Sequence, residues 1–274
     1  MEINELLARV YDLAWPNRHL RLDWPKPPAG SVRVPVPDGV DPYDLVDALS
    51  NRHGEPVDAP ALDCGDEVAW LYAWPHSDRW FVFGRGTGDD APHLAIATRS
   101  TPQPEELPAD ASWLERLVAV TGWVPPERPA IDWAAVESRL GTPLPSDYKR
   151  LVETFGDGAF DGFHGVFPPE EVISRAEYDA AHGAQEPWEP HPPFPAAGGR
   201  LLWAANEAEQ EIAWLTEGPD PDRWPVHAKG CGPVPGQRFD SSSTEFLFRQ
   251  LTDRQHPFCF GAGVRAHWFE RGGV

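Results

Sequence analysis

Prolines limit how this chain can fold more than any other feature, since they make up 32 of its 274 residues. Each proline fixes its own φ and lacks a backbone N–H, so it is excluded from helix interiors and from central strands. We therefore expect short helices and strands joined by many turns. Hydrophobic residues still make up 41% of the chain and include 13 tryptophans, which is enough for a packed core in each half.

The length favours two domains, and the prolines indicate where they divide. Three prolines lie within residues 124–129, VPPERP, which predicts a stiff linker. We expect an N-terminal domain over residues 1–123 and a second domain over residues 130–252. Residues 253–274 form a tail that could add a pair of strands at a sheet edge.

Hydrophobic spacing and turn residues predict an α+β pattern in the first half. The expected helices cover residues 2–15, 41–54 and 111–122, and the expected strands cover residues 31–36, 67–74, 79–84 and 93–99. Pro35 makes the first of these strands an edge strand. The turn chemistry between the other three predicts a meander.

The second half repeats this mixture of elements. The expected helices cover residues 132–140, 146–155 and 244–251, and the expected strands cover residues 200–204, 210–216 and 223–228. Residues 183–199 contain five prolines without helical periodicity, so we expect a long surface loop there.

Two segments of the chain resemble each other. Residues 67–88 and 211–232 align at a constant offset of 144 and are identical at 11 of 22 positions. The halves are either diverged copies of one fold or separate folds that share a hairpin rich in Trp, Pro and Asp. In both interpretations Trp70 and Trp214 anchor a sheet face, and the tripeptide Asp-Arg-Trp starts the returning strand.

Acidic residues dominate both halves of the chain. There are 43 acids against 23 bases, a formal net charge of −20, and residues 1–128 and 129–274 each contribute −10. Nucleic-acid binding through phosphate contacts is disfavoured, because it requires clustered Lys and Arg. Such a surface keeps a protein soluble, and it would also attract a basic partner protein.

Motifs for catalysis or metal binding are not evident. The sequence has no G-x-S-x-G elbow, and His164, His182, His191, His227, His256 and His267 follow no metal-ligand spacing. Gly84, Gly86 and Gly88 precede an expected strand, so a hairpin turn is favoured over a phosphate loop. Cys64, Cys231 and Cys259 are far apart and suggest no disulfide framework. We expect no cofactor and no metal.

The N-terminal residues MEINELLARVYDLAW do not resemble a signal peptide, since acids interrupt their apolar run. No segment approaches the roughly 18 apolar residues of a membrane span. We therefore expect a cytoplasmic protein that does not associate with membranes.

Residues 130–252 carry four ordered blocks that resemble the SUKH superfamily. The first is a helix followed by LGTPLPSDYKRLVETFGDG, the second is VFPPEEV, the third is a tryptophan-bearing hairpin containing W-P, and the last is a closing E-F-L helix. The proline-rich stretch at residues 183–199 departs from the family pattern and makes the loop contacts uncertain.

The resemblance implies an α+β fold with a bent antiparallel or mixed sheet flanked by helices, and the N-terminal domain would be a second α+β unit. It also implies a non-enzymatic role in binding proteins, most often as an immunity protein that neutralises a secreted bacterial toxin, while eukaryotic relatives regulate cell-wall synthesis. A basic, nuclease-like toxin would suit acids placed beside aromatic anchors. The candidate partner-binding residues are Asp157, Asp161, Glu170, Glu171, Trp188, Asp220, Asp222 and Trp224.

Two alternatives stay open. One is a regulatory or scaffold protein of the same family without a toxin partner, and the other is an enzyme in the N-terminal half. The paired acids Glu170-Glu171 and Asp220/Asp222 would act as a general acid and base only in a cleft that perturbs their pKa values. A solvated helix start and a turn are their simpler interpretations.

Overall fold

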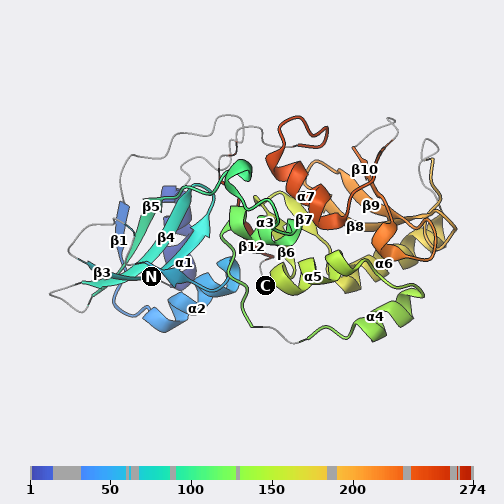
Figure 1. Ribbon diagram of the computed structural model, residues 1–274. Coiled ribbons are helices and arrows are strands. Elements are labelled where there is room, and N and C mark those ends of the chain that lie inside the picture. The colour runs from blue at the N-terminus through green and yellow to red at the C-terminus, as the bar shows by residue number, and fades with distance from the viewer. Residues whose placement is uncertain are drawn as a thin grey trace. The chain divides into compact units, whose positions relative to one another are not determined.

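The computed structural model describes residues 2–14, 32–59, 62, 68–86, 91–127, 130–183, 190–230, 236–259, 264 and 266–272 (Figure 1). The chain forms two compact units. Unit 1 comprises residues 1–101, 121–126 and 265–268, and unit 2 comprises residues 102–120, 127–264 and 269–274. The predicted α+β class, with sheets flanked by helices, is confirmed, and both sheets are antiparallel.

Unit 1 contains one sheet of five strands. Its elements are α1 (Ile3–Ala14), β1 (Val32–Pro35), α2 (Pro42–His53), β2 (Val57–Asp58), β3 (Val68–His76), β4 (Arg79–Gly86) and β5 (Pro92–Thr98). The strand order β1-β5-β4-β3-β2 confirms the predicted meander and the predicted edge position of β1. Asp41 caps α2 by accepting a hydrogen bond from the Tyr43 N–H at 2.8 Å, as its sequence signal indicates.

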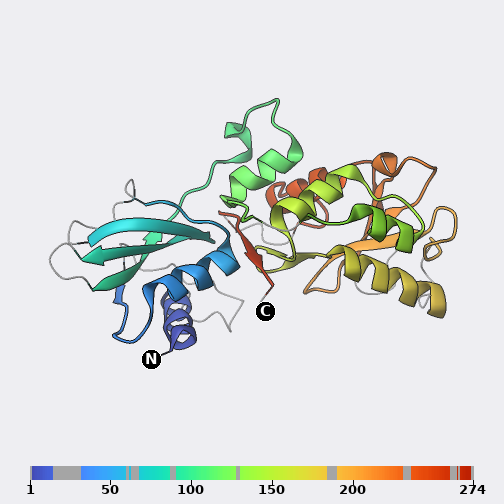
Figure 2. The same cartoon turned by 90° about the horizontal axis from the view of Figure 1, so that it is seen from below.

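Each face of this sheet packs its own hydrophobic cluster. Helices α1 and α2 lie on one face (Figure 2), where Leu6, Leu45, Trp74 and Phe81 are fully buried. The other face carries a smaller cluster that consists of Trp70 with four alanines and two valines. Strands β3 and β4 therefore contribute side chains to the hydrophobic clusters on both faces of the sheet.

Arg99 holds three distant segments of unit 1 together. Its guanidinium donates hydrogen bonds to the carbonyl oxygens of Ser77 at 2.9 Å, Thr121 at 2.5 Å and His267 at 2.8 Å. Its side chain also lies over the Trp80 ring, with Cζ 5.3 Å from the ring centroid. At Gly122, φ is +65° and a Cβ would lie 2.7 Å from Arg99 Nη2, so this turn requires glycine.

Unit 2 contains a sheet of seven strands. Its helices are η1 (Pro104–Glu106), α3 (Trp113–Thr121, whose last residue belongs to unit 1), α4 (Trp133–Leu140), α5 (Ser146–Phe155), α6 (Pro169–His182), η2 (Pro221–Arg223) and α7 (Ser243–Thr252). Its strands are β6 (Gly158–Phe160), β7 (His164–Val166), β8 (Arg200–Asn206), β9 (Glu211–Leu215), β10 (Val226–Lys229), β11 (Gln237–Phe239) and β12 (Phe269–Arg271). Their order is β11-β10-β9-β8-β7-β6-β12.

Stacked aromatic rings form the centre of the unit 2 core. Trp203 and Trp214 stack with centroids 5.5 Å apart, and the Tyr148 ring meets Trp214 edge-on at 4.9 Å. The buried Trp214 indole donates to Ser243 Oγ at 2.9 Å, which ties β9 to the start of α7. Trp214 thus anchors its sheet face, as the sequence indicates.

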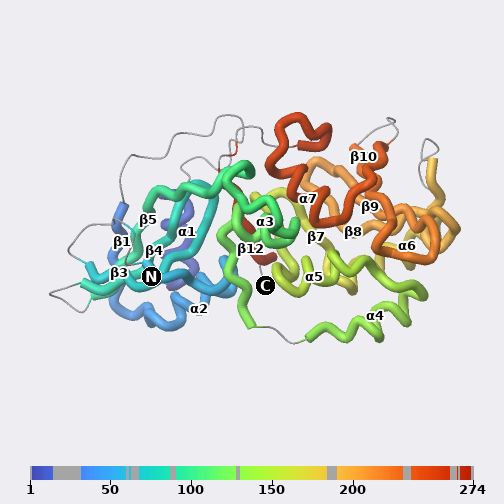
Figure 3. Tube along the Cα trace, in the orientation of Figure 1, coloured from blue at the N-terminus to red at the C-terminus, as the bar shows by residue number. Residues whose placement is uncertain are grey.

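The units interleave where the sequence indicates a single boundary at residues 124–129. Residues 102–120, which include most of α3, belong to unit 2 and not to the predicted N-terminal domain. Trp113 on α3 explains this placement, because its ring contacts Phe248 of α7 at 5.5 Å and is covered by Arg249. From the tail, β12 pairs with β6 at the sheet edge (Figure 3), and it is the one strand of the expected pair among the tail residues that the structure describes.

The two similar segments form related hairpins with different geometry. In each unit a strand precedes them and another follows, giving the meanders β2-β3-β4-β5 and β8-β9-β10-β11. In unit 1 Asp-Arg-Trp follows the tight turn, and Arg79 begins β4 as predicted. In unit 2 the same tripeptide lies in and after η2, so the prediction that it starts the returning strand is wrong there.

Proline accounts for this difference. Pro219 matches Pro75, which lies within β3, so it does not distinguish the two segments. Pro221 and Pro225 replace Ser77 and Phe81 and withhold two backbone donors from the second segment, where β9 ends at Leu215 and β10 begins at Val226. The register changes with it, since Trp214 pairs with Val226 whereas Trp70 pairs with Gly84. The shared strand order suits both interpretations of the repeat, and duplication stays a prediction.

Replacement of Arg99 by Met should destabilise unit 1 strongly. Three buried carbonyls would lose their donor, and we expect a loss of about 3 to 5 kcal/mol in the free energy of unfolding. Urea unfolding followed by circular dichroism measures the change. Arg85→Met is the matched control, because Arg85 is exposed on β4, and it should change the free energy of unfolding by less than about 0.5 kcal/mol. Equal midpoints for the two variants would contradict the role given to Arg99.

Candidate functional site

Two of the predicted acids lie at the start of η2, and one of them, Asp222, also holds the start of helix α5. Asp222 accepts a hydrogen bond from the Ser146 N–H at 2.6 Å, which satisfies one of the unpaired donors of the first helical turn. Asp220 caps the short helix η2 by accepting from the Asp222 N–H at 3.2 Å. Both carboxylates are exposed, so they face solvent while they fix the local backbone.

Glu170 and Glu171 occupy the first turn of α6, where carboxylates favour the helix dipole. Glu171 pairs with Arg175 one turn later at 2.8 Å, and the Glu170 side chain is exposed. The nearby Tyr148 hydroxyl donates to the Phe167 carbonyl at 2.6 Å. Burial, with smaller effects from the two carboxylates, raises the pKa of Tyr148, so its hydroxyl remains a neutral donor.

The remaining acids lie beyond the other end of α5. Asp157 is exposed between α5 and β6, and Asp161 is half-buried with φ +55° in the β6–β7 turn. Helix α5 has ten residues, which span about 15 Å, between these two acids and Asp222. Asp157 and Asp161 therefore lie at the opposite end of α5 from Asp222.

The two predicted tryptophans contribute little to a described surface. Trp224 is 5% exposed, and its indole N–H donates to the Gly218 carbonyl at 3.1 Å, so it stabilises the loop before β10. Trp188 lies outside the described residues. The surface that can be described in unit 2 is thus acidic and has no aromatic anchor among the predicted residues.

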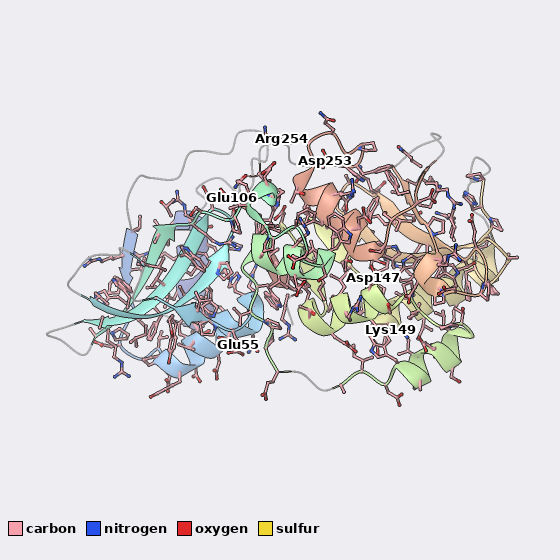
Figure 4. The ribbon with its side chains drawn as sticks, viewed as in Figure 1. Glu55, Glu106, Asp147, Lys149, Asp253 and Arg254 are labelled. Carbon is pink, nitrogen blue, oxygen red and sulfur yellow. The ribbon has the colours of Figure 1, made fainter. Side chains whose placement is uncertain are left out.

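Sequence reasoning missed the structural role of Asp147. Its carboxylate accepts hydrogen bonds from the Thr244 N–H at 2.8 Å and from the hydroxyls of Thr244 and Ser243, which joins α5 to the start of α7. Figure 4 labels Asp147 and Lys149 on α5. No local signal links these residues, since Asp147 and Thr244 are 97 positions apart.

An open groove of about 810 Å³ lies in unit 1 between α2 and strands β3 and β4. The residues that line it include Tyr43, Asp47, Glu55, Leu71, Tyr72 and Arg85. The register of β3 against β4 shifts between Trp70 and Tyr72, and this bulge leaves the consecutive residues Leu71 and Tyr72 both exposed. The groove has no motif of its own in the sequence, although the unbroken apolar run WLYAW, residues 70–74, is a signal of irregular alternation.

A buried histidine pair brings together His53, the last residue of α2, and His76, the last residue of β3. His53 Nε2 and the Tyr11 hydroxyl share a hydrogen bond of 2.5 Å, and the His53 and His76 rings are 4.9 Å apart. Burial, assisted by the positive charge of Arg52, lowers the pKa of His53 to about 3. Burial also lowers the pKa of His76, with further contributions from His53, Arg52 and Arg99. With His53 0% and His76 3% exposed, this pair is part of the core and cannot reach a substrate.

Within the described ranges, no group of three or more His, Cys, Asp or Glu residues could hold a metal ion. Among the helices that the structure describes, none is both long and apolar enough to cross a bilayer. Comparison of the chain with protein-family models, curated proteins and solved structures finds no match.

The buried histidine pair predicts that the folded state loses stability on mild acidification. In the unfolded chain His53 takes up a proton below pH 6.5, whereas in the folded state its pKa is about 3. Its contribution is therefore fully present above pH 6.5 and is lost progressively as the pH falls toward 3. Between pH 7.5 and pH 5.0 we expect a loss of about 2 kcal/mol from His53, with a further loss in the same direction from His76.

Urea unfolding at a series of pH values measures this dependence. His53→Gln should flatten the change by about 2 kcal/mol, because the variant cannot take up a proton at this position. Tyr11→Phe is the control, since it removes the hydrogen bond and leaves the buried imidazole. An unchanged pH profile in the His53→Gln variant would contradict the assignment.

Proposed function

We propose that this chain acts in the bacterial cytoplasm as a stoichiometric binder of a basic partner protein, in the manner of an immunity protein that neutralises a toxin. Two observations support the proposal. Residues 130–252 carry the SUKH-like blocks, and the unit that contains them has a strongly acidic surface. Both observations concern binding, and neither requires a catalytic residue.

The charge of unit 2 carries the proposal. Its residues include 27 acids and 13 bases, a formal charge of −14, against 16 acids and 10 bases in unit 1. Many of the bases in unit 2 are engaged in ion pairs. These are Arg139–Glu177, Lys149–Glu137, Arg175–Glu171, Arg200–Glu211, Arg238–Glu217 and Arg249–Glu245. Pairing leaves the excess negative charge on acids without a basic neighbour.

Three of the predicted residues belong to this unpaired set. Asp157, Glu170 and Asp220 are exposed, and none forms an ion pair with a base in the part of the chain that the structure describes. They lie on the segments before β6, at the start of α6 and before η2. Unpaired acids on several elements favour a partner with a broad basic surface, as nucleases and other nucleic-acid-binding toxins have.

The mechanism would combine steering and blockade. Negative charge accelerates the encounter with a basic protein, and this effect weakens as salt screens charges beyond about 8 Å at physiological ionic strength. A bound module then covers the active site or substrate groove of the toxin. Because binding alone is sufficient, the chain needs no catalytic group of its own.

Co-expression with the toxin encoded beside its gene tests the proposal most directly. We expect growth rescue and a one-to-one complex in pull-down experiments. Absence of both, with a toxin of verified activity, would overturn the immunity role for that pair. A stable complex with a neighbouring protein that is not toxic would instead favour the regulatory alternative.

Charge reversal at the unpaired acids should slow association with such a toxin. For Glu170→Lys and for Asp157→Lys we expect an association rate reduced about fivefold at low salt, with a smaller difference at high salt. Stopped-flow fluorescence measures these rates. Asp38→Lys is the matched control, because it changes the net charge equally at an exposed turn of unit 1. Equal slowing by the control would show that the charge of the whole molecule, and not this surface, steers the partner.

A further inference from the structure

The groove of unit 1 gathers exposed apolar side chains that the fold leaves uncovered. Five large hydrophobic residues in the described ranges are well exposed, and three of them line this groove: Tyr43 at 73%, Leu71 at 38% and Tyr72 at 39%. Scattered single exposures need no explanation, but concentration in one concave site indicates a contact surface. Tyrosine is also enriched among the residues that dominate protein interfaces.

Contacts in the hydrophobic core hold α2 and β3, the two walls of the groove, in position. Trp74, two residues after Tyr72, is fully buried and donates from its indole N–H to Ser50 Oγ of α2 at 3.2 Å. The Tyr72 and Trp74 rings lie 6.3 Å apart, and Phe83 opposite Tyr72 is 3% exposed. The bulge and this indole–hydroxyl bond therefore fix the distance between α2 and β3, so the groove is preformed.

Unpaired charges lie beside the exposed rings. Asp47 follows Tyr43 by four residues on α2, so the two side chains are neighbours on one helix face. Glu55, labelled in Figure 4, follows the end of the same helix. Within the part of the chain that the structure describes, the side chains of Asp47, Glu55 and Arg85 form no ion pair or hydrogen bond. The groove thus presents two free carboxylates and one free cation.

A tyrosine face next to a free carboxylate is suited to bind a guanidinium. The planar cation stacks on an aromatic ring and at the same time pairs with an acid. Leu71, Tyr72 and the ring of Tyr43 supply apolar surface on both sides of such a contact. Arg85 in the lining repels a second cation, which favours a ligand with one arginine among apolar residues over a polybasic ligand.

From these contacts we propose that the groove of unit 1 is a docking site for an extended segment of a partner protein, in which a single arginine flanked by apolar side chains inserts between α2 and β3. Its guanidinium stacks on Tyr43 or Tyr72 and pairs with Asp47 and Glu55, while the flanking side chains cover Leu71. This site lies in unit 1 and does not depend on toxin neutralisation by unit 2.

Fluorine NMR on the full chain labelled with 3-fluorotyrosine tests the proposal. The protein has five tyrosines, and single Tyr→Phe variants assign their signals. The probe is a synthetic capped peptide, Gly-Ser-Leu-Arg-Leu-Ser-Gly, compared with the same peptide that carries citrulline in place of arginine. We expect saturable shifts of the Tyr43 and Tyr72 signals, with the exposed Tyr178 on α6 unmoved as the internal control.

Charge and position are tested separately. The citrulline peptide should bind about fivefold more weakly, and Asp47→Asn should weaken the arginine peptide by a similar factor. Asp44→Asn is the matched control, since Asp44 is exposed on α2 outside the groove lining, and it should leave the affinity unchanged.

Three outcomes would overturn the proposal. They are shifts that do not saturate, equal affinity for the citrulline peptide, and Tyr43 signals that move with protein concentration when no peptide is present. The last result would assign the groove to a second copy of the chain.

Discussion

The guanidinium of Arg99 is the interaction on which the closure of unit 1 depends. This unit is assembled from three separate stretches of chain, and hydrophobic packing alone is too non-directional to fix the ends of the shorter two. Arg99 donates to one carbonyl in each of the two shorter stretches and to a third carbonyl in the β3–β4 turn of the longest stretch. These three bonds use the rigid fork of donors of a guanidinium, which lysine lacks. Since its partners are carbonyls of Ser77, Thr121 and His267, the sequence of those residues matters less than the path of their backbone. Gly122, with its positive φ, gives the chain that path.

Local signals predicted most of the elements, and long-range relations account for what they missed. Asp132 and Gly141 bound α4, and Gly156 ends α5, because capping depends on residues within one turn of the helix end. The interleaving of the units could not be predicted in this way, since it depends on Trp113 packing against a helix more than 120 residues later. The two similar hairpins show that local sequence identity does not determine strand register. Eleven identical positions did not give them one register, because Pro221 and Pro225 of the second segment removed donors that a longer strand requires.

The acids of unit 2 show how one residue type serves two purposes. Sequence alone identified Asp220 and Asp222 as a pair in a turn, and both are exposed. Asp222 binds the free N–H of Ser146, so replacing it would disturb α5 as well as any partner. The side chains of Glu170 and Asp157 accept no hydrogen bond in the part of the chain that the structure describes, so replacing them disturbs the fold less than replacing Asp222 would. The sequence cannot tell a carboxylate that binds a backbone N–H from one that is free to bind a partner. The donor to Asp222 belongs to Ser146, which is 76 positions away in the chain.

The two candidate surfaces differ in the range over which they would act. Acids distributed over unit 2 act through the summed field, which extends about one Debye length and does not require a fitted contact. The groove of unit 1 has a formal charge of only −1 in its lining, so its selectivity must come from short-range stacking and apolar contact. A partner that used both would be attracted by one unit and recognised by the other. Salt would then change how quickly it binds, whereas Tyr43, Leu71 and Tyr72 would determine how slowly it leaves, because apolar contacts are not screened.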